Sequence, residues 1–403
     1  MNEIEEYLAA AAGQPEVQVG EDITIRVDLA MAHDVTAPLA LTAFAEIGID
    51  RVFDKRKVAF VADHVYPAPT VQARQGQRQM RNFANTYGIK MFEGEGVCHQ
   101  VVAENYSLPR GSVVVGADSH TCTAGAYGAL AIGVGSTEFA AAMATGTLDI
   151  EVPPVYEVVL DGILVPGVYA KDIILHLIGA FGTAGFTDKA VIFTGEWVRT
   201  ASLEERMTIS NMTIEMGAML SYFSIKNDVG SVAKVHKFDV SMIVPLMAAP
   251  SSPANVQPVA NLAGQTVTQV IIGSCTNGRI NDMREAAAVF SHASINPNVN
   301  CIILPASQLV AQAMEDEGLT KIFRRAGATI ANAGCGPCFG GHLGLAASDD
   351  VVISTTNRNF PGRMGSKESR VYLASPRTAA EAAVAGKIVT PGTVAELGGR
   401  TDE

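Results

Sequence analysis

Three cysteines occur in glycine-rich segments that could hold a metal group. Cys335 and Cys338 stand three positions apart in "NAGCGPC" (332–338), and Cys275 lies in "IIGSCTNG" (271–278). Glycine lets the backbone approach a bound group closely, and such loops leave backbone N–H groups free to bind cluster sulfurs. Three thiolates can hold three irons of a 4Fe-4S cube and leave the fourth iron without a protein sulfur. From spacing alone, a zinc ion, a disulfide or redox pair, and ordinary buried thiols remain alternatives.

Several histidines occur where acid–base chemistry is possible. Four of the eight lie in polar motifs, most of them beside or close to an aspartate: His33, His64, His99 and His120. A neighbouring carboxylate fixes the tautomer of an imidazole and raises its basicity. Each of these histidines taken alone can equally be a hydrogen-bonded structural residue, so only their combination with other motifs indicates a site.

Two arginines in "NRNFPGR" (357–363), Arg358 and Arg363, are candidates for substrate binding. A guanidinium group clamps a carboxylate through paired N–H donors, and two such groups in one loop suit a dicarboxylate or a tricarboxylate. The alternative is that both are ordinary surface arginines. Asn357 stands directly beside them.

Most of these residues end segments that are typical of buried strands. Apolar, β-branched runs occupy 57–64, 111–120, 266–278 and 351–359, and each ends in polar residues. Helical patterns lie between them, at 137–148, 170–181 and 280–293. This alternation predicts an α/β architecture with mostly parallel sheets. In such sheets, functional side chains gather beyond the carboxyl ends of the strands.

The composition limits the classes of function. The 403 residues suffice for two or three domains, and the net charge of -12 argues against a general affinity for nucleic acid or anionic membranes. An acidic N-terminus without an apolar cleavage-type segment predicts a protein without a signal peptide, soluble and cytoplasmic. Six cysteines in so long a chain predict thiols rather than a disulfide scaffold. The proline-rich segment 247–265 is predicted to be an interdomain linker, and 151–158 a weaker boundary.

Four long motifs, in order, resemble the aconitase superfamily, closest to large subunits of the isopropylmalate and homoaconitate hydratase type. They are "GADSHTCTAGAYGALAIGVGSTE" (116–138), "IIGSCTNGRINDMREAA" (271–287), "NAGCGPC" and "TTNRNFPGR" (355–363), and the likeness runs from about Asp28 to the C-terminus. The resemblance implies three α/β/α domains of the aconitase type with mostly parallel sheets, without the fourth, swivel domain. The expected boundaries are 1–152, 153–262 and 263–403, the last domain carrying the cluster cysteines.

The resemblance also implies roles for individual residues. Cys275, Cys335 and Cys338 would hold a 4Fe-4S cluster, whereas Cys98, Cys122 and Cys301 would be structural. The expected catalytic residues, which include a pair that helps the hydroxyl leave and a glutamate that pairs with His99, are Asp63, His64, His99, Asp118, His120 and Glu215. The expected substrate-binding residues are His33, Ser119, Asn211, Asn357, Arg358 and Arg363. The four-residue spacing of Asn211 and Glu215 would place both on one helix face. "HDVT" (33–36) departs from aconitase proper, which has glutamine at the position of His33, and is usual in isopropylmalate-type chains.

The implied activity is that of a hydro-lyase that interconverts hydroxy-acid isomers through an unsaturated intermediate. The favoured substrate is 3-isopropylmalate, interconverted via 2-isopropylmaleate in leucine biosynthesis, and homoaconitate and 2,3-dimethylmalate are alternatives. The serine base and further arginines of the fourth domain would come from a separate small subunit in a heterodimer or heterotetramer. An apo-form RNA-binding regulator and an electron-transfer protein are alternatives from other classes. The charge opposes the former, and the lack of an evident fourth cysteine ligand opposes the latter.

Overall fold

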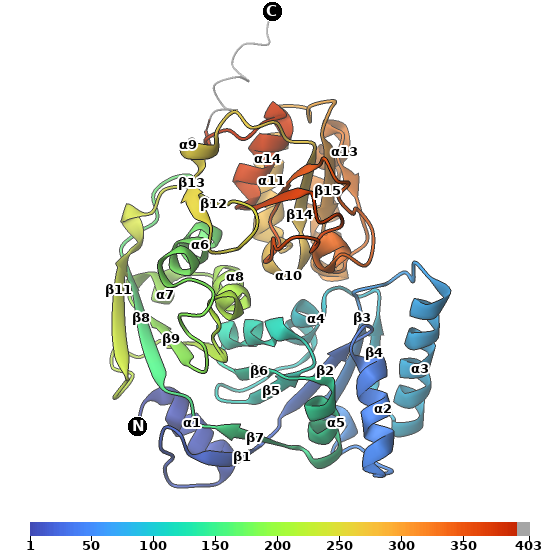
Figure 1. Cartoon of the computed structure of the whole chain (residues 1–403), viewed down its shortest axis with the longest axis vertical. Coiled ribbons are helices and arrows are strands. Elements are labelled where there is room, and N and C mark those ends of the chain that lie inside the picture. The colour runs from blue at the N-terminus through green and yellow to red at the C-terminus, as the bar shows by residue number, and fades with distance from the viewer. Residues whose placement is uncertain (393–403) are drawn as a thin grey trace, which may run out of the picture. The chain divides into compact units, whose positions relative to one another are not determined.

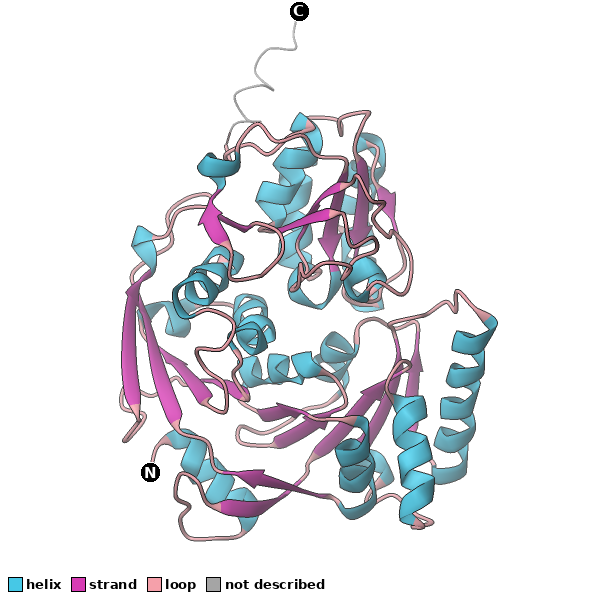
Figure 2. Ribbon diagram, viewed as in Figure 1, coloured by secondary structure: helices cyan, strands magenta, loops and turns pink. Residues whose placement is uncertain are grey.

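A computed structural model describes residues 1–392 (Figures 1 and 2). Within this part of the chain, no helix has both the length and the apolar character needed to cross a bilayer. Residue contacts divide the chain into two compact units, which we describe separately. Unit 1 comprises residues 1–93, 101–163 and 184–241; unit 2 comprises 94–100, 164–183 and the chain from 242 onward.

A parallel five-stranded sheet forms the centre of unit 1, in the order β4-β3-β2-β5-β6. Strands β2, β3 and β5 are buried at every position and β6 at three of its four, because both faces are covered, which explains their continuous apolar sequences. In the edge strand β4, only Phe92 is buried. The strands are β2 (Leu29–His33), β3 (Val58–Ala62), β4 (Lys90–Glu93), β5 (Val113–Gly116) and β6 (Leu130–Gly133). The helices that belong to this part are α2 (Ala37–Ile47), α3 (Val71–Tyr87) and α5 (Ser136–Thr145), and a 3-10 helix, η2 (Ser119–Tyr127), follows β5.

Two further sheets complete unit 1. A parallel four-stranded sheet has the order β10-β9-β8-β11, and an antiparallel pair joins β1 to β7. Their strands are β1 (Asp22–Arg26), β7 (Thr147–Glu151), β8 (Val155–Asp161), β9 (Ala190–Thr194), β10 (Leu220–Phe223) and β11 (Lys234–Asp239). The accompanying helices are α1 (Glu3–Ala12), α7 (Glu196–Thr200), α8 (Leu203–Met212) and the 3-10 helix η3 (Thr213–Met216). Helix α4 (Cys98–Asn105) connects segments of the two units along the chain.

Unit 2 is built on a seven-stranded sheet in the order β13-β12-β18-β17-β14-β15-β16. Five of its strands are parallel, and β12 and β13 are antiparallel additions at one edge. The strands are β12 (Leu246–Ala248), β13 (Val256–Pro258), β14 (Gln269–Gly273), β15 (Asn300–Leu304), β16 (Thr329–Ile330), β17 (Val351–Ser354) and β18 (Arg370–Leu373). The helices are α6 (Ala170–Phe181), α9 (Val259–Leu262), α10 (Ser274–Asn277), α11 (Ile280–Phe290), α12 (Gln308–Asp316), α13 (Leu319–Ala326), α14 (Pro376–Ala385) and the 3-10 helix η5 (Gly336–Phe339).

Strand β14 shows why these runs are apolar at every position. Val270 and Ile272 pack into the core shared with α11, α13 and α14, whereas Ile271 packs into a second core on the other face of the sheet. Because side chains alternate between the faces of a strand, burial on both faces requires an apolar residue at each step. The strand that leads to Cys275 is therefore fixed from both sides.

The structure confirms the predicted mostly parallel α/β architecture. All four predicted strand segments contain strands, and the predicted helix at 170–181 coincides with α6. The structure contradicts the linker prediction for 247–265, since this segment overlaps β12 and contains β13 and α9. Pro258 fits in β13 because that strand lies at the edge of the sheet. The division into domains at 152 and 262 stays a prediction, and residues 393–403 of the third predicted domain lie outside the described part.

Candidate functional site

Three neighbouring strands of unit 1 deliver the predicted histidines and aspartates to one edge of the sheet. His33 is the last residue of β2, Asp63 and His64 follow β3, and Asp118 follows β5. Because β3, β2 and β5 are adjacent and parallel, their carboxyl ends lie together. We call this group, together with Asp34, His120 and Glu215, the histidine cluster.

The rings of His33 and His64 are stacked, with centroids 3.7 Å apart. The Nδ1 atom of His64 lies 2.7 Å from Oδ1 of Asp63, and its Nε2 atom lies 3.6 Å from Oδ2 of Asp118. The same Asp118 oxygen is 3.2 Å from Nε2 of His33. The Nδ1 atom of His33 accepts a hydrogen bond from the N–H of Val35 at 3.3 Å, so Nε2 is the nitrogen that carries the proton.

Burial on its own would lower the pKa of His64. The negative charge of Asp63 and its hydrogen bond oppose this effect, as do the charges of Asp118 and Asp34, and the result is a pKa raised to about 9. His64 is therefore an imidazolium at neutral pH. An imidazolium held in place by a buried carboxylate is a proton donor of fixed orientation.

Asp34 serves as the structural anchor of the cluster. Its carboxylate accepts hydrogen bonds from the backbone N–H groups of Asp63, His64 and Val65 and from Nε2 of Gln77, at 2.9 to 3.2 Å. The ligand atoms of His33, Asp34, Asp63 and His64 all lie within 4.8 Å of one another, a spacing that a metal ion could use. Both carboxylate oxygens of Asp34, however, already accept hydrogen bonds from N–H donors. We therefore interpret the group as a hydrogen-bonded network.

His120 connects the cluster to the segment that follows α8. Its backbone N–H donates to Oδ1 of Asp118 at 2.6 Å, and its Nε2 atom lies 3.0 Å from Oε1 of Glu215. Ser119 Oγ lies 3.5 Å from Nδ1 of His120. Asn211 is fully buried and donates to Oγ1 of Thr123 at 2.9 Å.

The geometry of Asn211 and Glu215 differs from the predicted shared helix face. Helix α8 ends at Met212, and Glu215 belongs to the tighter 3-10 helix η3. The change of helix type alters the rotation per residue, so a spacing of four no longer aligns the two side chains. The pairing of Glu215 with His99 stays a prediction, and the partner that the structure gives for Glu215 is His120.

The three predicted cluster cysteines lie together in unit 2. Cys275, Cys335 and Cys338 are buried and pack with Val97, Ala306 and Phe339. Cys275 is in α10, directly after β14. Cys335 is the residue just before η5, and Cys338 lies within η5. We call these three residues the cysteine cluster.

Asn357 connects two of these sulfurs. Strand β17 is the neighbour of β14, and Asn357 follows it. Its Nδ2 atom donates to Sγ of Cys275 at 3.4 Å, and its Oδ1 atom accepts from Sγ of Cys338 at 3.4 Å. One fully buried amide therefore contacts sulfurs from both cysteine loops.

Glycines permit the close packing of these loops. Gly273, at φ +142°, precedes the Cys275 turn, and a Cβ there would lie 2.0 Å from the carbonyl oxygen of Leu304. Gly340, at φ +78°, follows the Cys338 turn, and a Cβ there would lie 2.8 Å from the carbonyl oxygen of Arg363. Only glycine fits both the backbone conformation and the space. The second contact places the loop of Arg363 directly against the loop of Cys338.

The remaining cysteines are ordinary buried thiols. Burial raises the pKa of Cys122 and of Cys301 to about 12. Cys122 donates to the carbonyl oxygen of Ser210 at 3.2 Å, and Cys301 lies within β15. Among the described residues, none of the six cysteines, Cys98 included, forms a disulfide.

The predicted substrate residues of unit 2 lie near the cysteine cluster in the chain. Arg358 and Arg363 are partly buried in the loop that follows β17. Among the described residues, Nε of Arg363 is a buried donor with no hydrogen-bond partner. Such an atom suits an anionic ligand, because an unsatisfied buried donor is unfavourable. His99, in α4, is also buried in this unit.

Sequence reasoning missed several residues that hold these sites. Gln77 supports Asp34, and two buried cations, Lys171 and Arg279, contact the cysteine loops. Lys171 lies in the first turn of α6, "AKDIILHLIGAF", whose other residues are mostly apolar. A lysine in so apolar a helix was the signal in the sequence that could have indicated a buried, functional charge.

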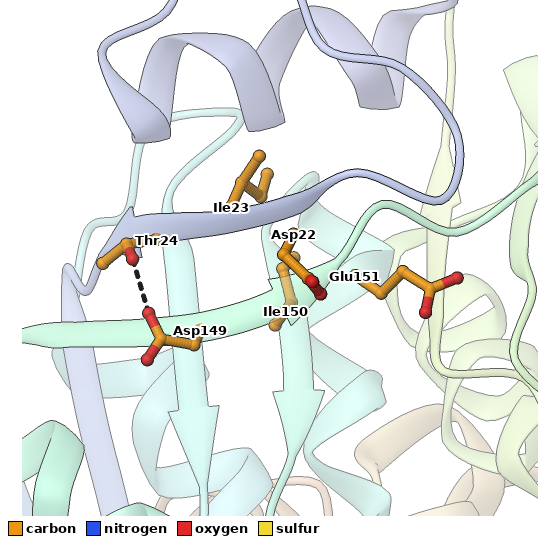
Figure 3. A pocket seen from close by; sticks show the side chains of 6 residues that line it. All are labelled: Asp22, Ile23, Thr24, Asp149, Ile150 and Glu151. Atoms are coloured by element: carbon orange, nitrogen blue, oxygen red, sulfur yellow. Dashed lines mark hydrogen bonds between the residues drawn. The ribbon is translucent and has the colours of Figure 1, made fainter.

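A pocket of about 420 Å³ lies elsewhere in unit 1, along β1 and β7 (Figure 3). Its polar lining includes Asp22, Thr24, Asp149 and Glu151, and Thr24 donates to Asp149. Three carboxylates would repel a hydroxy dicarboxylate, so this pocket does not suit the predicted substrate class.

Comparisons with known proteins agree with these motifs. The model of the Aconitase family (aconitate hydratase) matches residues 7–234 and 231–386. The chain is 43% identical to the "3-isopropylmalate dehydratase large subunit" of Aquifex aeolicus over 417 residues, which cover 97% of this chain and 96% of that protein. It is also 43% identical to the "3-isopropylmalate dehydratase large subunit 1" of Pyrococcus furiosus, across 96% of this chain and 97% of that protein.

A solved structure supports the fold. The crystal structure of aconitase X from Thermococcus kodakaraensis, in its holo-form, covers 89% of this chain and 93% of its own chain, with a TM-score of 0.52 and 13% identity. The family model, the near-complete coverage of the relatives and the two residue clusters at the ends of parallel strands lead to one conclusion. The chain belongs to the aconitase family.

Proposed function

We propose that this chain is the large subunit of a hydro-lyase of the 3-isopropylmalate dehydratase type. The reaction removes water from one isopropylmalate isomer and adds it back to 2-isopropylmaleate to give the other isomer. Relatives with 43% identity over nearly their whole length carry this name. The observation that carries the proposal is the cysteine cluster: three buried thiols from two loops, with the Asn357 amide against two of their sulfurs.

The cysteine cluster fits a 4Fe-4S group held by Cys275, Cys335 and Cys338. Three soft sulfur ligands are gathered, Asn357 lies against two of them, and the other three cysteines of the chain lie outside the set. A bound cluster with one iron free of protein sulfur supplies a Lewis acid to the substrate. An apolar surrounding of Val97, Ala306 and Phe339 limits the access of water to the sulfurs.

The histidine cluster supplies the acid–base groups of this chain. His64 holds a proton at Nε2 because Nδ1 is engaged by Asp63, and we assign that proton to the departing hydroxyl group. Asp63 and Asp118 keep His64 charged, and stacking on His33 fixes the plane of its ring. His120 is oriented by Glu215 and by the backbone contact with Asp118. His99, Ser119 and Asn211 keep the roles that the family resemblance implies.

Arg358 and Arg363 are assigned to the carboxylates of the substrate. The buried and unpaired Nε of Arg363 supports this assignment, because a carboxylate would complete its hydrogen bonding. Carboxylates are common to isopropylmalate, homoaconitate and 2,3-dimethylmalate, so these arginines do not distinguish among the three acids. The relatives' names, which contain the words "3-isopropylmalate dehydratase", favour isopropylmalate.

We further propose a small subunit as partner and the cytoplasm as location. The partner would contribute the serine base and the pocket for the side group of the substrate. The net charge of -12 opposes the alternative of an RNA-binding regulator.

The test is an anaerobic reconstitution. The chain is loaded with iron and sulfide, mixed with its small subunit, and assayed with isopropylmalate, homoaconitate and dimethylmalate. We expect the conjugated unsaturated acid to form from isopropylmalate with the highest kcat/KM, and we expect no turnover by the chain alone. Exchange for a foreign small subunit should change which acid is preferred. Failure of the complete complex to dehydrate isopropylmalate or dimethylmalate, and to add water to homoaconitate, would overturn the proposal.

A further inference from the structure

The turn that carries Cys275 has a backbone that needs support. Helix α10 is a single turn of four residues, and Ser274 at its start has φ +66°, in the left-handed region. A residue with a Cβ in this region is strained by about 1 kcal/mol. Such a turn persists only where surrounding groups hold it.

Arg279 supports one side of this turn. Its side chain is 1% exposed, and it donates to the carbonyl oxygens of Cys275 at 2.7 Å and Thr276 at 2.8 Å. Its Nε atom donates to Oε1 of Gln100 at 3.1 Å. The guanidinium group therefore satisfies carbonyl groups that a longer helix would satisfy internally.

Lys171 connects the turn to the loop of Asn357. Its side chain is fully buried, and its ammonium donates to the carbonyl oxygens of Thr355 at 2.7 Å and Thr356 at 2.6 Å, and to Oδ1 of Asn277 at 3.2 Å. Asn277 ends α10, and Thr356 directly precedes Asn357. The Lys171 side chain thus joins the turn of Cys275 to the backbone directly before Asn357, whose amide contacts the sulfurs of Cys275 and Cys338.

The three acceptors determine the charge of Lys171. A neutral amine has two N–H donors and a lone pair, and the lone pair would face one of the three oxygens. Burial lowers the pKa of Lys171 to about 7, and the charge of Asp282 acts in the opposite direction. The geometry requires the ammonium form, which completes three hydrogen bonds. A positive charge is thereby fixed beside the cysteine loops.

We propose that Lys171 is a positioning residue for the iron-sulfur site, which holds the loops of Cys275 and Asn357 in register and compensates the negative charge of the thiolates. This inference rests on the proposed function, since it concerns the same cysteine cluster. Metal binding requires deprotonated thiols, and a nearby fixed cation lowers the free energy of three thiolates in a buried site. Outer-shell groups of this kind typically change metal affinity about 10- to 100-fold.

Two neutral variants test the proposal. Lys171→Met removes the charge and the donors, whereas Lys171→Gln removes the charge and keeps two N–H donors on a side chain one atom shorter. Each is reconstituted anaerobically beside the wild-type chain. We measure the iron and sulfide bound, the rate of iron loss to a chelator, the EPR spectrum and the reduction potential. We expect iron to be retained about 10- to 100-fold less well. In the fraction that keeps a cluster, we expect a more negative reduction potential. Without the Lys171 charge, the reduced and more negative state of the cluster is less well stabilised.

Arg377→Met is the matched control. Arg377 is a partly buried cation of unit 2, paired with Glu381 at 3.0 Å, and both residues are remote from the cysteine loops in the chain. It should lower the free energy of unfolding and leave the potential and the EPR spectrum unchanged. If both Lys171 variants bind a full cluster with the wild-type potential, or if neither folds, Lys171 is only a residue of the core and the proposal is overturned. A wild-type chain that takes up no iron would instead contradict the proposed function.

Discussion

The Nε2 atom of His120 lies 3.0 Å from Oε1 of Glu215, and both side chains are buried. A buried histidine with a carboxylate partner has a fixed ring orientation and a fixed tautomer. The pair joins η2, which lies between β5 and β6 in the chain, to η3, which follows α8. The charge of Glu215 can therefore be removed while a hydrogen-bond acceptor for His120 is kept.

The substitution Glu215→Gln should lower kcat/KM about 100-fold, at the lower end of what a positioned acid–base group contributes. Glutamine still accepts a hydrogen bond but carries no charge, so His120 keeps its place and loses its ionic partner. Steady-state kinetics with the reconstituted complex measure the loss. Glu205→Gln, which alters the capping box of α8, the helix that precedes η3, serves as the control. Equal kinetics for Glu215→Gln and the wild type would remove Glu215 from the catalytic residues.

The reaction should slow as the pH rises through about 9, because His64 then loses its proton. The Asp63 charge is the largest influence that raises this pKa, so Asp63→Asn should move the limb of the kcat profile to lower pH. The profile is measured from pH 6 to 10 with both complexes. A limb that stays in place in Asp63→Asn would contradict the assignment of His64 as the proton donor.

The same shift predicts a dependence of stability on pH. The folded-state pKa of His64 is raised above its value of 6.5 in an unfolded chain, so its contribution is fully present below pH 6.5 and is lost as pH rises through about 9. The difference in unfolding free energy between the wild type and His64→Gln should therefore shrink over this window. Urea unfolding of the apo chain at several pH values measures it, with the exposed His292→Gln as the control. A difference that is constant with pH would argue against a charged His64.

Each of Cys275→Ser, Cys335→Ser and Cys338→Ser should abolish the visible absorbance of the cluster and the activity, because three ligands already leave one iron uncoordinated by protein. Cys122→Ser is the matched control, since burial raises the pKa of that thiol to about 12 and its sulfur donates to a backbone carbonyl. Iron content and absorbance after reconstitution are the readouts. Full absorbance in any of the first three variants would exclude that residue as a ligand.

The substitution Arg363→Lys should raise KM and lower kcat/KM about 10- to 100-fold, the loss expected when hydrogen bonds to a charged group are removed. Lysine keeps the charge and loses the paired donors that suit a carboxylate. Arg370→Lys, at the exposed start of β18, is the control. Unchanged KM and kcat in Arg363→Lys would place Arg363 outside the substrate site.

The sequence predicted those parts of the site that follow strands. Polar residues after apolar runs, such as His64 and Asn357, were found because parallel strands end together. The grouping of His64 and Asp118 followed from this rule, although it depended on which strands are neighbours, which the sequence does not state. His33 was expected only from its motif and the family resemblance, because β2 was not among the predicted strands. Lys171 could not be assigned from sequence, because its three acceptors lie more than 100 positions away along the chain.

Local signals also failed where tertiary structure overrode them. Prolines and small residues in 247–265 are typical of a linker, yet this segment overlaps β12 and supplies the edge strand β13, where the missing N–H donor of Pro258 is harmless. The break between α8 and η3 lacks any glycine or proline before Gly217, so nothing in the sequence marked the change of helix type between Asn211 and Glu215.

The strand order of unit 2 has a consequence for the synthesis of the protein. Strand β18 (370–373) lies between β12 (246–248) and β17 (351–354), so the sheet has a gap until residues 370–373 have been made. A nascent chain that has just released Cys338 still lacks β17, Asn357 and β18. The cysteine loops therefore reach their final form only after residues 351–373 have emerged from the ribosome, and iron and sulfide would be delivered after that point of synthesis.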